Sequence, residues 1–233
     1  MCKCEDSAIC PTKKNMKNLL VAFGFLMLFM ACETPIYFDE PQPTNGKTEK
    51  GFDKKYIGRY QSTIEKGAFL DIEKDKVTGE WFWEVEKTKA ALDTLDGYVW
   101  KGDALFYYDK LQNTTVKGDT VIINGNSTEV LFAIGKDGVL KKYQKMYFLN
   151  HRFNSGWEVK KLHLATNDEL ILSEISTKEK MEYLQQVTNI DSVMVDDTSN
   201  DVRYYKANPS EKEFEAIMNG SFFKVEEVYV RVK

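Results

Sequence analysis

Polar and apolar residues alternate along the chain from Tyr56 to about Ile175. Side chains on a β-strand point to opposite faces in turn, so a period of two is typical of strands with one buried face. Turn-forming pairs such as Asp96-Gly97, Asp137-Gly138 and Ser155-Gly156 interrupt the alternation at short intervals. The pattern predicts a mainly β fold, an antiparallel meander that packs as a sandwich or closes into a barrel.

The strands are expected at residues 57–60, 68–72, 80–85, 105–108, 121–123, 130–134, 147–149, 157–164 and 170–175. Asn124-Gly125 is a hairpin-turn signal, so we expect a turn between the fifth and sixth of these strands. No stretch has the crossover helix that a parallel strand pair needs. We therefore expect a single β-rich domain over residues 56–233.

The C-terminal third contains two helix signals. The first is the capping box that begins at Ser176 and ends at Glu179, which predicts a short helix to about Gln186. Residues 191–201 follow it, and because they are acidic and poor in apolar side chains they predict a mobile loop.

The second helix signal has both of its ends marked. Asn208 is a helix-capping residue, Pro209 fits the first helical position, and Gly220 is a typical stop. Residues 224–232 are rich in valine and predict a closing strand. The β-rich domain should thus end with two short C-terminal helices and one strand.

The segment from Met16 to Cys32 has a different character. Lys17 gives it a basic start, an unbroken apolar run follows, and Ala31 precedes Cys32. The run is too short for a membrane-spanning helix, which needs about 20 residues. The segment resembles the signal peptide and lipobox of a bacterial, Bacteroidota-type lipoprotein, with residues 16–31 as the signal peptide.

This resemblance implies cleavage between Ala31 and Cys32 and attachment of lipid to Cys32. The protein would then be anchored in the cell envelope, in the outer membrane, with periplasmic and surface display both open. Residues 1–15, which hold Cys2, Cys4 and Cys10, precede the basic start and are interpreted as a mis-assigned N-terminal extension, with translation beginning at Met16. After cleavage the chain has no thiol left for a disulfide.

Residues 32–55 follow the expected cleavage site and contain Pro35, Pro41 and Pro43 together with many polar residues. Proline favours extended backbone, and a polar segment cannot form a core. We therefore expect a lipidated tether that holds the domain away from the membrane.

The charge balance excludes one class of partner. The chain holds 32 basic against 36 acidic residues, a formal net charge of −4. Binding to nucleic acid depends on basic patches that neutralise phosphates. We expect no nucleic-acid partner.

No catalytic or metal-binding motif is found in the sequence. His151 and His163 are the only histidines, and neither has a second ligand at metal-binding spacing. The acidic run that begins at Asp196 places Val202 where a calcium loop starting at Asp197 needs glycine. We expect no metal, no cofactor and no catalytic residues. The sequence thus favours a protein that is not an enzyme.

Aromatic residues are the best candidates for binding. Trp81, Trp83 and Val85 alternate on one strand and share one face, while Phe82 and its neighbouring glutamates share the other. The two tryptophans either lie in the core between sheets or form a ligand platform. Tyr107 lies within a run of three aromatic residues that cannot all face one side of a strand.

Two further patterns are specific enough to test. Asp93-Thr94, Asp119-Thr120 and Asp191-Ser192 each resemble the start of the O-glycosylation acceptor of Bacteroidota envelope proteins. Gly58 followed two residues later by Tyr60 resembles the opening motif of lipocalins, which implies a barrel that carries an apolar ligand.

The order of segments as a whole resembles small β-rich envelope lipoproteins to which no function is assigned. We expect a membrane-anchored, noncatalytic binding or structural component that engages a protein or glycan partner. The alternative is a lipocalin-like carrier of a small apolar ligand. A closed barrel with a large cavity would favour the carrier, and a filled sandwich with exposed aromatic residues would favour the binding component.

Overall fold

The computed structural model describes residues 34–153, 155–165, 168–177, 180–194, 202–220 and 222–232. The predicted signal peptide, the cleavage site at Ala31 and the lipidation site at Cys32 lie outside the described residues. So does the acidic run from Asp196 to Asp201.

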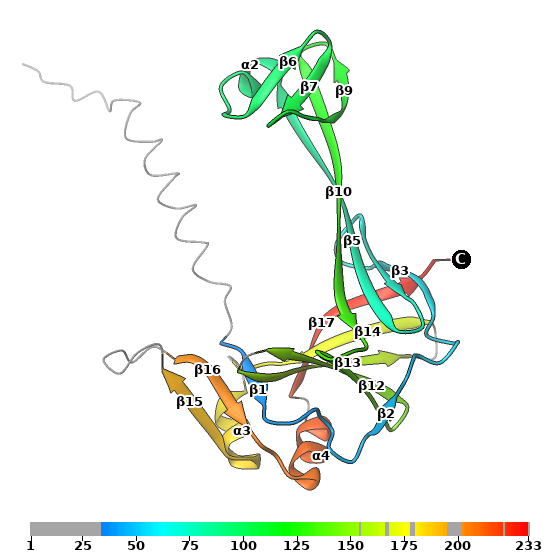
Figure 1. Ribbon diagram of the computed structural model, residues 1–233, viewed down its shortest axis with the longest axis vertical. Coiled ribbons are helices and arrows are strands. Elements are labelled where there is room, and N and C mark those ends of the chain that lie inside the picture. The colour runs from blue at the N-terminus through cyan, green and yellow to red at the C-terminus, as the bar shows by residue number, and fades with distance from the viewer. Residues whose placement is uncertain are drawn as a thin grey trace, which may run out of the picture.

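The fold is mainly β and antiparallel, as predicted, with two short C-terminal helices (Figure 1). The strands are β1 (Ile36–Phe38), β2 (Lys47–Glu49), β3 (Gly58–Ser62), β4 (Ala68–Ile72), β5 (Lys76–Thr88), β6 (Tyr98–Lys101), β7 (Ala104–Tyr107), β8 (Lys110–Leu111), β9 (Asn113–Lys117), β10 (Thr120–Ala133), β11 (Gly138–Tyr143), β12 (Met146–Phe153), β13 (Gly156–Leu164), β14 (Glu169–Ile175), β15 (Ile190–Met194), β16 (Val202–Ala207) and β17 (Phe223–Arg231). The helices are α2 (Lys89–Leu92), α3 (Met181–Val187) and α4 (Glu211–Asn219).

The body of the molecule is sandwich-like, and we call its two layers the short layer and the long layer. The short layer consists of β3, β4 and the adjoining ends of β5 and β10, and the long layer of β11, β12, β13, β14 and β17. The layers are continuous where β17 pairs with β3, at Tyr229 opposite Ser62. Among the described strands the sheet does not close into a barrel, because β10 and β11 follow each other without pairing.

Side chains from both layers fill the space between them. Leu70 and Val77 of the short layer belong to the same buried cluster as Leu162 and Leu170 of the long layer. Phe52 and Tyr56 of this cluster both pack edge-to-face on the Tyr147 ring. The alternation of the sequence is therefore explained by burial of one face of each layer.

A long two-stranded arm leaves the body. β5 and β10 stay paired from Val77 opposite Phe132 to Thr88 opposite Thr120, and their distal halves extend well beyond the body (Figure 1). At the end of the arm α2, β6, β7, β8 and β9 form a small lobe. Its core consists of Leu92, Leu105, Val121 and Ile123.

The predicted turn at Asn124-Gly125 is wrong, because both residues lie in the middle of β10. Gly125 is opposite Trp83 on β5, and a β-carbon at Gly125 would lie 2.0 Å from the Trp83 indole. The glycine therefore makes room for a neighbouring ring rather than for a reversal of the chain.

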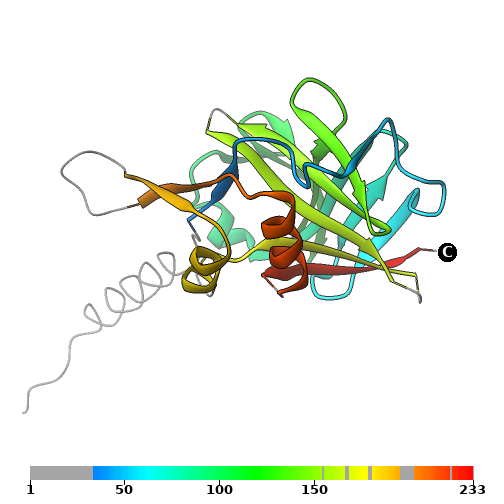
Figure 2. The same ribbon diagram turned by 90° about the horizontal axis from the view of Figure 1, so that it is seen from below.

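Residues 34–55 do not form the expected tether, because they are part of the folded body. β1 pairs antiparallel with β13 and β2 antiparallel with β11, but β1 and β16 form a parallel pair that the sequence did not predict. Ile36 and Phe38 are buried in a second cluster, which also contains residues of α3 and α4. Figure 2 shows the two helices in front of the sheet. The three prolines favoured the prediction of a tether. Pairing with strands far along the chain makes this segment part of the fold, and such pairing cannot be inferred from the local sequence.

A buried amide holds the turn that follows β1. The Gln42 backbone nitrogen donates to Asn150 Oδ1 at 2.6 Å, and Asn150 Nδ2 donates to the Gln42 carbonyl oxygen at 2.9 Å. Both residues are fully buried. The Asn150 side chain thus pairs with the backbone of Gln42 as a strand neighbour would.

Both predicted helices exist, but their N-termini differ from the prediction. α3 begins at Met181, with Lys180 in the capping position and without a side-chain cap. In α4 the cap is Ser210, which forms a capping box with Glu213, whereas Gly220 ends the helix as predicted. Apolar side chains of both helices, including Leu184 and Phe214, pack in the second cluster.

The predicted loop at 191–201 begins instead as a strand. β15 pairs with β16, with Ile190 opposite Ala207 and Ser192 opposite Tyr205. β15 forms one edge of the large sheet, so its polar residues remain exposed while its backbone is paired.

Candidate functional site

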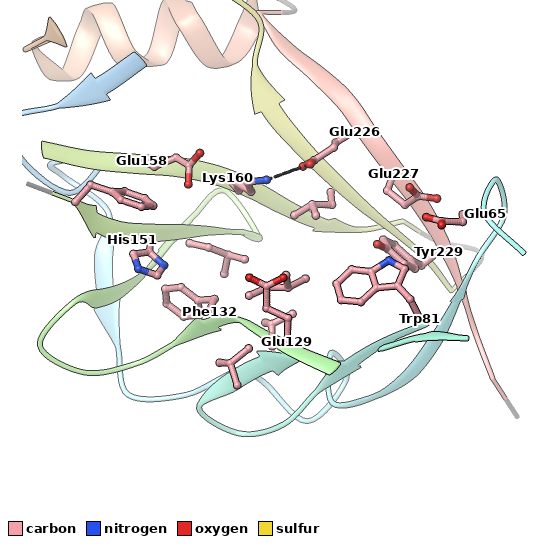
Figure 3. Close-up of a pocket in the computed structure, with 16 residues that line it drawn as sticks. Glu65, Trp81, Glu129, Phe132, His151, Glu158, Lys160, Glu226, Glu227 and Tyr229 are labelled. Carbon is pink, nitrogen blue, oxygen red and sulfur yellow. Dashed lines mark hydrogen bonds and ion pairs between the residues drawn. The ribbon is translucent and has the colours of Figure 1, made fainter. Parts of the chain in front are cut away.

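A pocket of about 430 Å³ lies between the two layers of the body (Figure 3). Its floor is apolar and includes Val77, Leu131, Phe132, Leu149 and Leu172. Its walls and rim carry Glu65, Trp81, Glu129, Val130, His151, Phe153, Glu158, Lys160, Glu226, Glu227 and Tyr229. The volume falls within the range of ligand sites in proteins.

Strand alternation places the polar side chains of the long layer. Glu158 and Lys160 are two residues apart on β13 and therefore share a face, as do Leu149 and His151 on β12. On β17 two consecutive residues, Glu226 and Glu227, line the pocket. The pairing of β14 with β17 shifts register at this point, and a bulge lets neighbouring residues turn toward one side.

Among the described residues that line the pocket, Lys160 is the only lysine or arginine, and it is already paired. Its Nζ lies 3.0 Å from Glu226 Oε2 and 3.7 Å from Glu174 Oε2. Burial acts to lower the pKa of Lys160, but Glu226, Glu158 and Glu174 outweigh it, so the pKa is raised. The lysine stays charged and neutralises only part of the rim.

Tyr229 lies in the same acidic surroundings as Lys160. Burial raises the pKa of its phenol far above the usual value, and Glu227, Glu226 and Glu65 raise it further. The phenol therefore remains neutral beside the pocket.

Trp81 joins the pocket to the arm. Its indole packs over Gly79, where a β-carbon would lie 2.4 Å from the ring, and Glu129 lies opposite Gly79 on β10. Trp83 lies two residues further along the same face, covers Gly125, and is 45% exposed. The structure thus brings together two of the three aromatic residues singled out from sequence.

Tyr107 is not part of this arrangement. It lies in the separate sheet of the lobe, where its ring centroid is 4.6 Å from that of Tyr98 and 4.7 Å from that of Tyr108. Tyr108 is 67% exposed. These tyrosines form an exposed aromatic patch at the end of the arm.

The glutamates of the pocket were missed by the sequence analysis. The alternation on the predicted strand 157–164 would have placed Glu158 and Lys160 on one face. The sequence near Glu129 and Glu226 does not indicate that these residues line the same pocket as Glu158 and Lys160. Their positions depend on the pairing of β10 with β5 and on the bulge in β17.

The two histidines lie in different places on the sheet. His151 lines the pocket and its ring stacks on Phe153 at 4.9 Å between centroids, whereas His163 lies further along β13. Among the residues that the structure describes, no group of three or more histidine, cysteine, aspartate or glutamate side chains is placed to hold a metal ion.

The three candidate O-glycosylation sites lie in different settings. Thr94 follows α2 and donates through its hydroxyl to the Ala91 carbonyl oxygen at 2.8 Å. Thr120 begins β10, and Ser192 is exposed on the edge strand β15.

In the described part of the chain, no helix has the length and hydrophobicity needed to cross a membrane. Comparison of the chain with protein-family models, with curated proteins and with solved structures finds no match.

Proposed function

We propose that the protein is a noncatalytic, lipid-anchored component of the cell envelope that binds a protein or glycan partner. The binding surface consists of the pocket and the face of the arm that carries Trp81 and Trp83; we call that face the tryptophan face. The observation that supports this most strongly is the continuity of the two, since Trp81 belongs to both.

The tryptophan face has the properties of a contact surface. Trp83 and Val85 are exposed there, and the residues opposite Trp81 and Trp83 on β10 are the small Ser127 and Gly125. Exposed aromatic residues contribute most strongly to protein interfaces and also stack on sugar rings. An elongated partner lying along the arm would cover this face and reach the pocket.

The proposed anchor lies very close to the folded body. Cys32 is two residues before Thr34, whose carbonyl oxygen accepts a hydrogen bond from Thr177 Oγ1 at 2.6 Å. Two residues span at most about 7 Å. Lipid on Cys32 would thus hold the body against the membrane, and the arm, not a tether, would give the protein its reach (Figure 1).

The alternative of a lipocalin-like carrier has less support. The described strands do not close into a barrel, and buried aromatic and aliphatic side chains occupy part of the space between the layers. The apolar floor of the pocket is the feature that favours it.

Replacement of Cys32 by serine tests the anchor. The variant should leave the membrane fraction, and a variant that still sediments with membranes contradicts lipidation at this residue.

The binding surface is tested with purified protein, presented separately to envelope proteins and to envelope polysaccharides of the source cell. Trp83→Ala should weaken binding to one of the two classes about tenfold or more, as removal of an interface tryptophan does. Thr128→Ala is the control, because Thr128 is exposed on the opposite face of the arm. Equal binding by both variants contradicts the proposal.

A further inference from the structure

The pocket offers two kinds of surface to one ligand. Its floor of aliphatic side chains and Phe132 takes an apolar group, and the indole of Trp81 forms a wall beside it (Figure 3). Glutamates stand above this floor on three sides, on β10, β13 and β17. A ligand that fills the pocket must therefore satisfy an apolar base and a carboxylate-rich mouth.

The negative charge at the mouth is only partly compensated. Lys160 is engaged by Glu226, and Glu227 accepts a hydrogen bond from Ser62. Among the described residues no lysine, arginine or histidine lies within ion-pair distance of Glu65, Glu129 or Glu158. Two of these three, Glu129 and Glu158, face the pocket from opposite layers.

Trp81 strengthens the preference for positive charge. A cation close to an indole face is attracted by the ring, most strongly where water is excluded. Glu129 neighbours this ring, because it is opposite Gly79, over which the indole packs (Figure 3). A single cationic group can therefore meet a carboxylate and an aromatic face together.

We propose that the pocket selects an ammonium or guanidinium group carried on an apolar stem. The cation binds between Glu129 and Glu158 beside Trp81, and the stem lies on the floor formed around Phe132 and Leu149. Free amphiphilic amines and the lysine or arginine side chains of a protein both present this chemistry. The inference deepens the proposed function and rests on use of the pocket as a binding site.

Isothermal titration calorimetry of the full chain with octylammonium, octanoate and octanol tests the inference at neutral pH. The three probes share a chain length and differ in charge. Octylammonium should bind about tenfold or more tightly than octanol, and octanoate should not bind. A short lysine-containing peptide forms the second arm, so that tighter binding of the peptide indicates a partner protein and tighter binding of octylammonium indicates a free amine.

The double variant Glu129→Gln/Glu158→Gln should lose most of the preference for octylammonium over octanol. Glu84→Gln/Glu86→Gln is the matched control, since it removes the same charge from the exposed opposite face of the arm. Equal binding of all three eight-carbon probes overturns the inference but leaves the pocket as a binding site. If neither the probes nor the peptide bind, the inference is also overturned. The Trp83→Ala comparison tests the proposed function independently of this result.

Discussion

The indole of Trp83 lies over Gly125, its partner across the arm, so that the ring occupies the space of the missing side chain. This pair lies within the continuous pairing of β5 with β10 between the body and the lobe. It also fixes the orientation of a tryptophan that is 45% exposed.

Gly125→Ala should force the Trp83 ring away from β10, because the added methyl group would lie 2.0 Å from it. We expect a loss of about 1–2 kcal/mol in the free energy of unfolding, together with weaker partner binding. Urea denaturation measures the loss of stability, and near-ultraviolet circular dichroism detects the displacement of the Trp83 ring. Gly135→Ala is the control, since no atom lies within 4 Å of a β-carbon there, and equal losses in the two variants contradict the expectation.

Asn150→Ala should release the N-terminal segment. The substitution leaves the buried backbone groups of Gln42 without their partner, so we expect a loss of about 2–4 kcal/mol in unfolding free energy. Limited proteolysis should show faster cleavage within residues 34–55. Asn126→Ala, at an exposed position of the arm, should do neither. A segment that resists protease equally in both variants would show that Asn150 does not hold it.

Leu105→Ala should loosen the lobe without unfolding the body. Leu105 is fully buried, and its cluster contains residues of the lobe and of the distal end of β10 but none of the body. Removal of a buried leucine side chain costs about 2–5 kcal/mol. Hydrogen exchange should become faster for the amides of β6 and β7 and stay slow for those of β13 and β14. Leu111→Ala, at a residue that is 66% exposed, is the control. Loss of protection throughout the chain would mean that lobe and body unfold together.

The stability of the protein should depend on pH through His163. Burial lowers the pKa of His163, and the charges of Lys161 and Lys55 lower it further. The unfolded chain then binds more protons than the folded one below the ordinary pKa of about 6.5. The stabilisation is complete above that pH and is lost as the pH falls toward the folded-state pKa.

Chemical denaturation of the wild type between pH 7 and pH 5 should show this loss, with a slope from one group no steeper than about 1.4 kcal/mol per pH unit. His163→Gln should make the dependence shallower, because glutamine does not titrate. An identical slope in the two proteins contradicts the assignment to His163.

Much of the body could be predicted from local pattern. The strand predicted at 68–72 has the same bounds as β4, because Ala68, Leu70 and Ile72 are buried and alternate with partly exposed residues. The end of α4 could likewise be predicted from a local signal, the glycine at position 220. Such features depend on residues close together in sequence, where periodicity and capping are informative.

Features that depend on distant partners could not be predicted. β1 and β2 are short, and the segment around them contains three prolines. Their pairing partners β13, β16 and β11 follow more than 90 residues later. The pocket is a further case, since Glu129, Glu158 and Glu226 are far apart in the chain. Trp81 and Trp83 were found because the strand pattern placed them on one face.

Site-specific photo-crosslinking in living cells tests the central claim most directly. A photoreactive amino acid is placed at Ser127, on the tryptophan face, or at Asn126, which is its exposed neighbour on the opposite face. We predict that irradiation links the partner to position 127 and not to position 126. Equal crosslinking from both positions, or crosslinking from position 126 alone, would contradict the proposal that the tryptophan face is the binding surface.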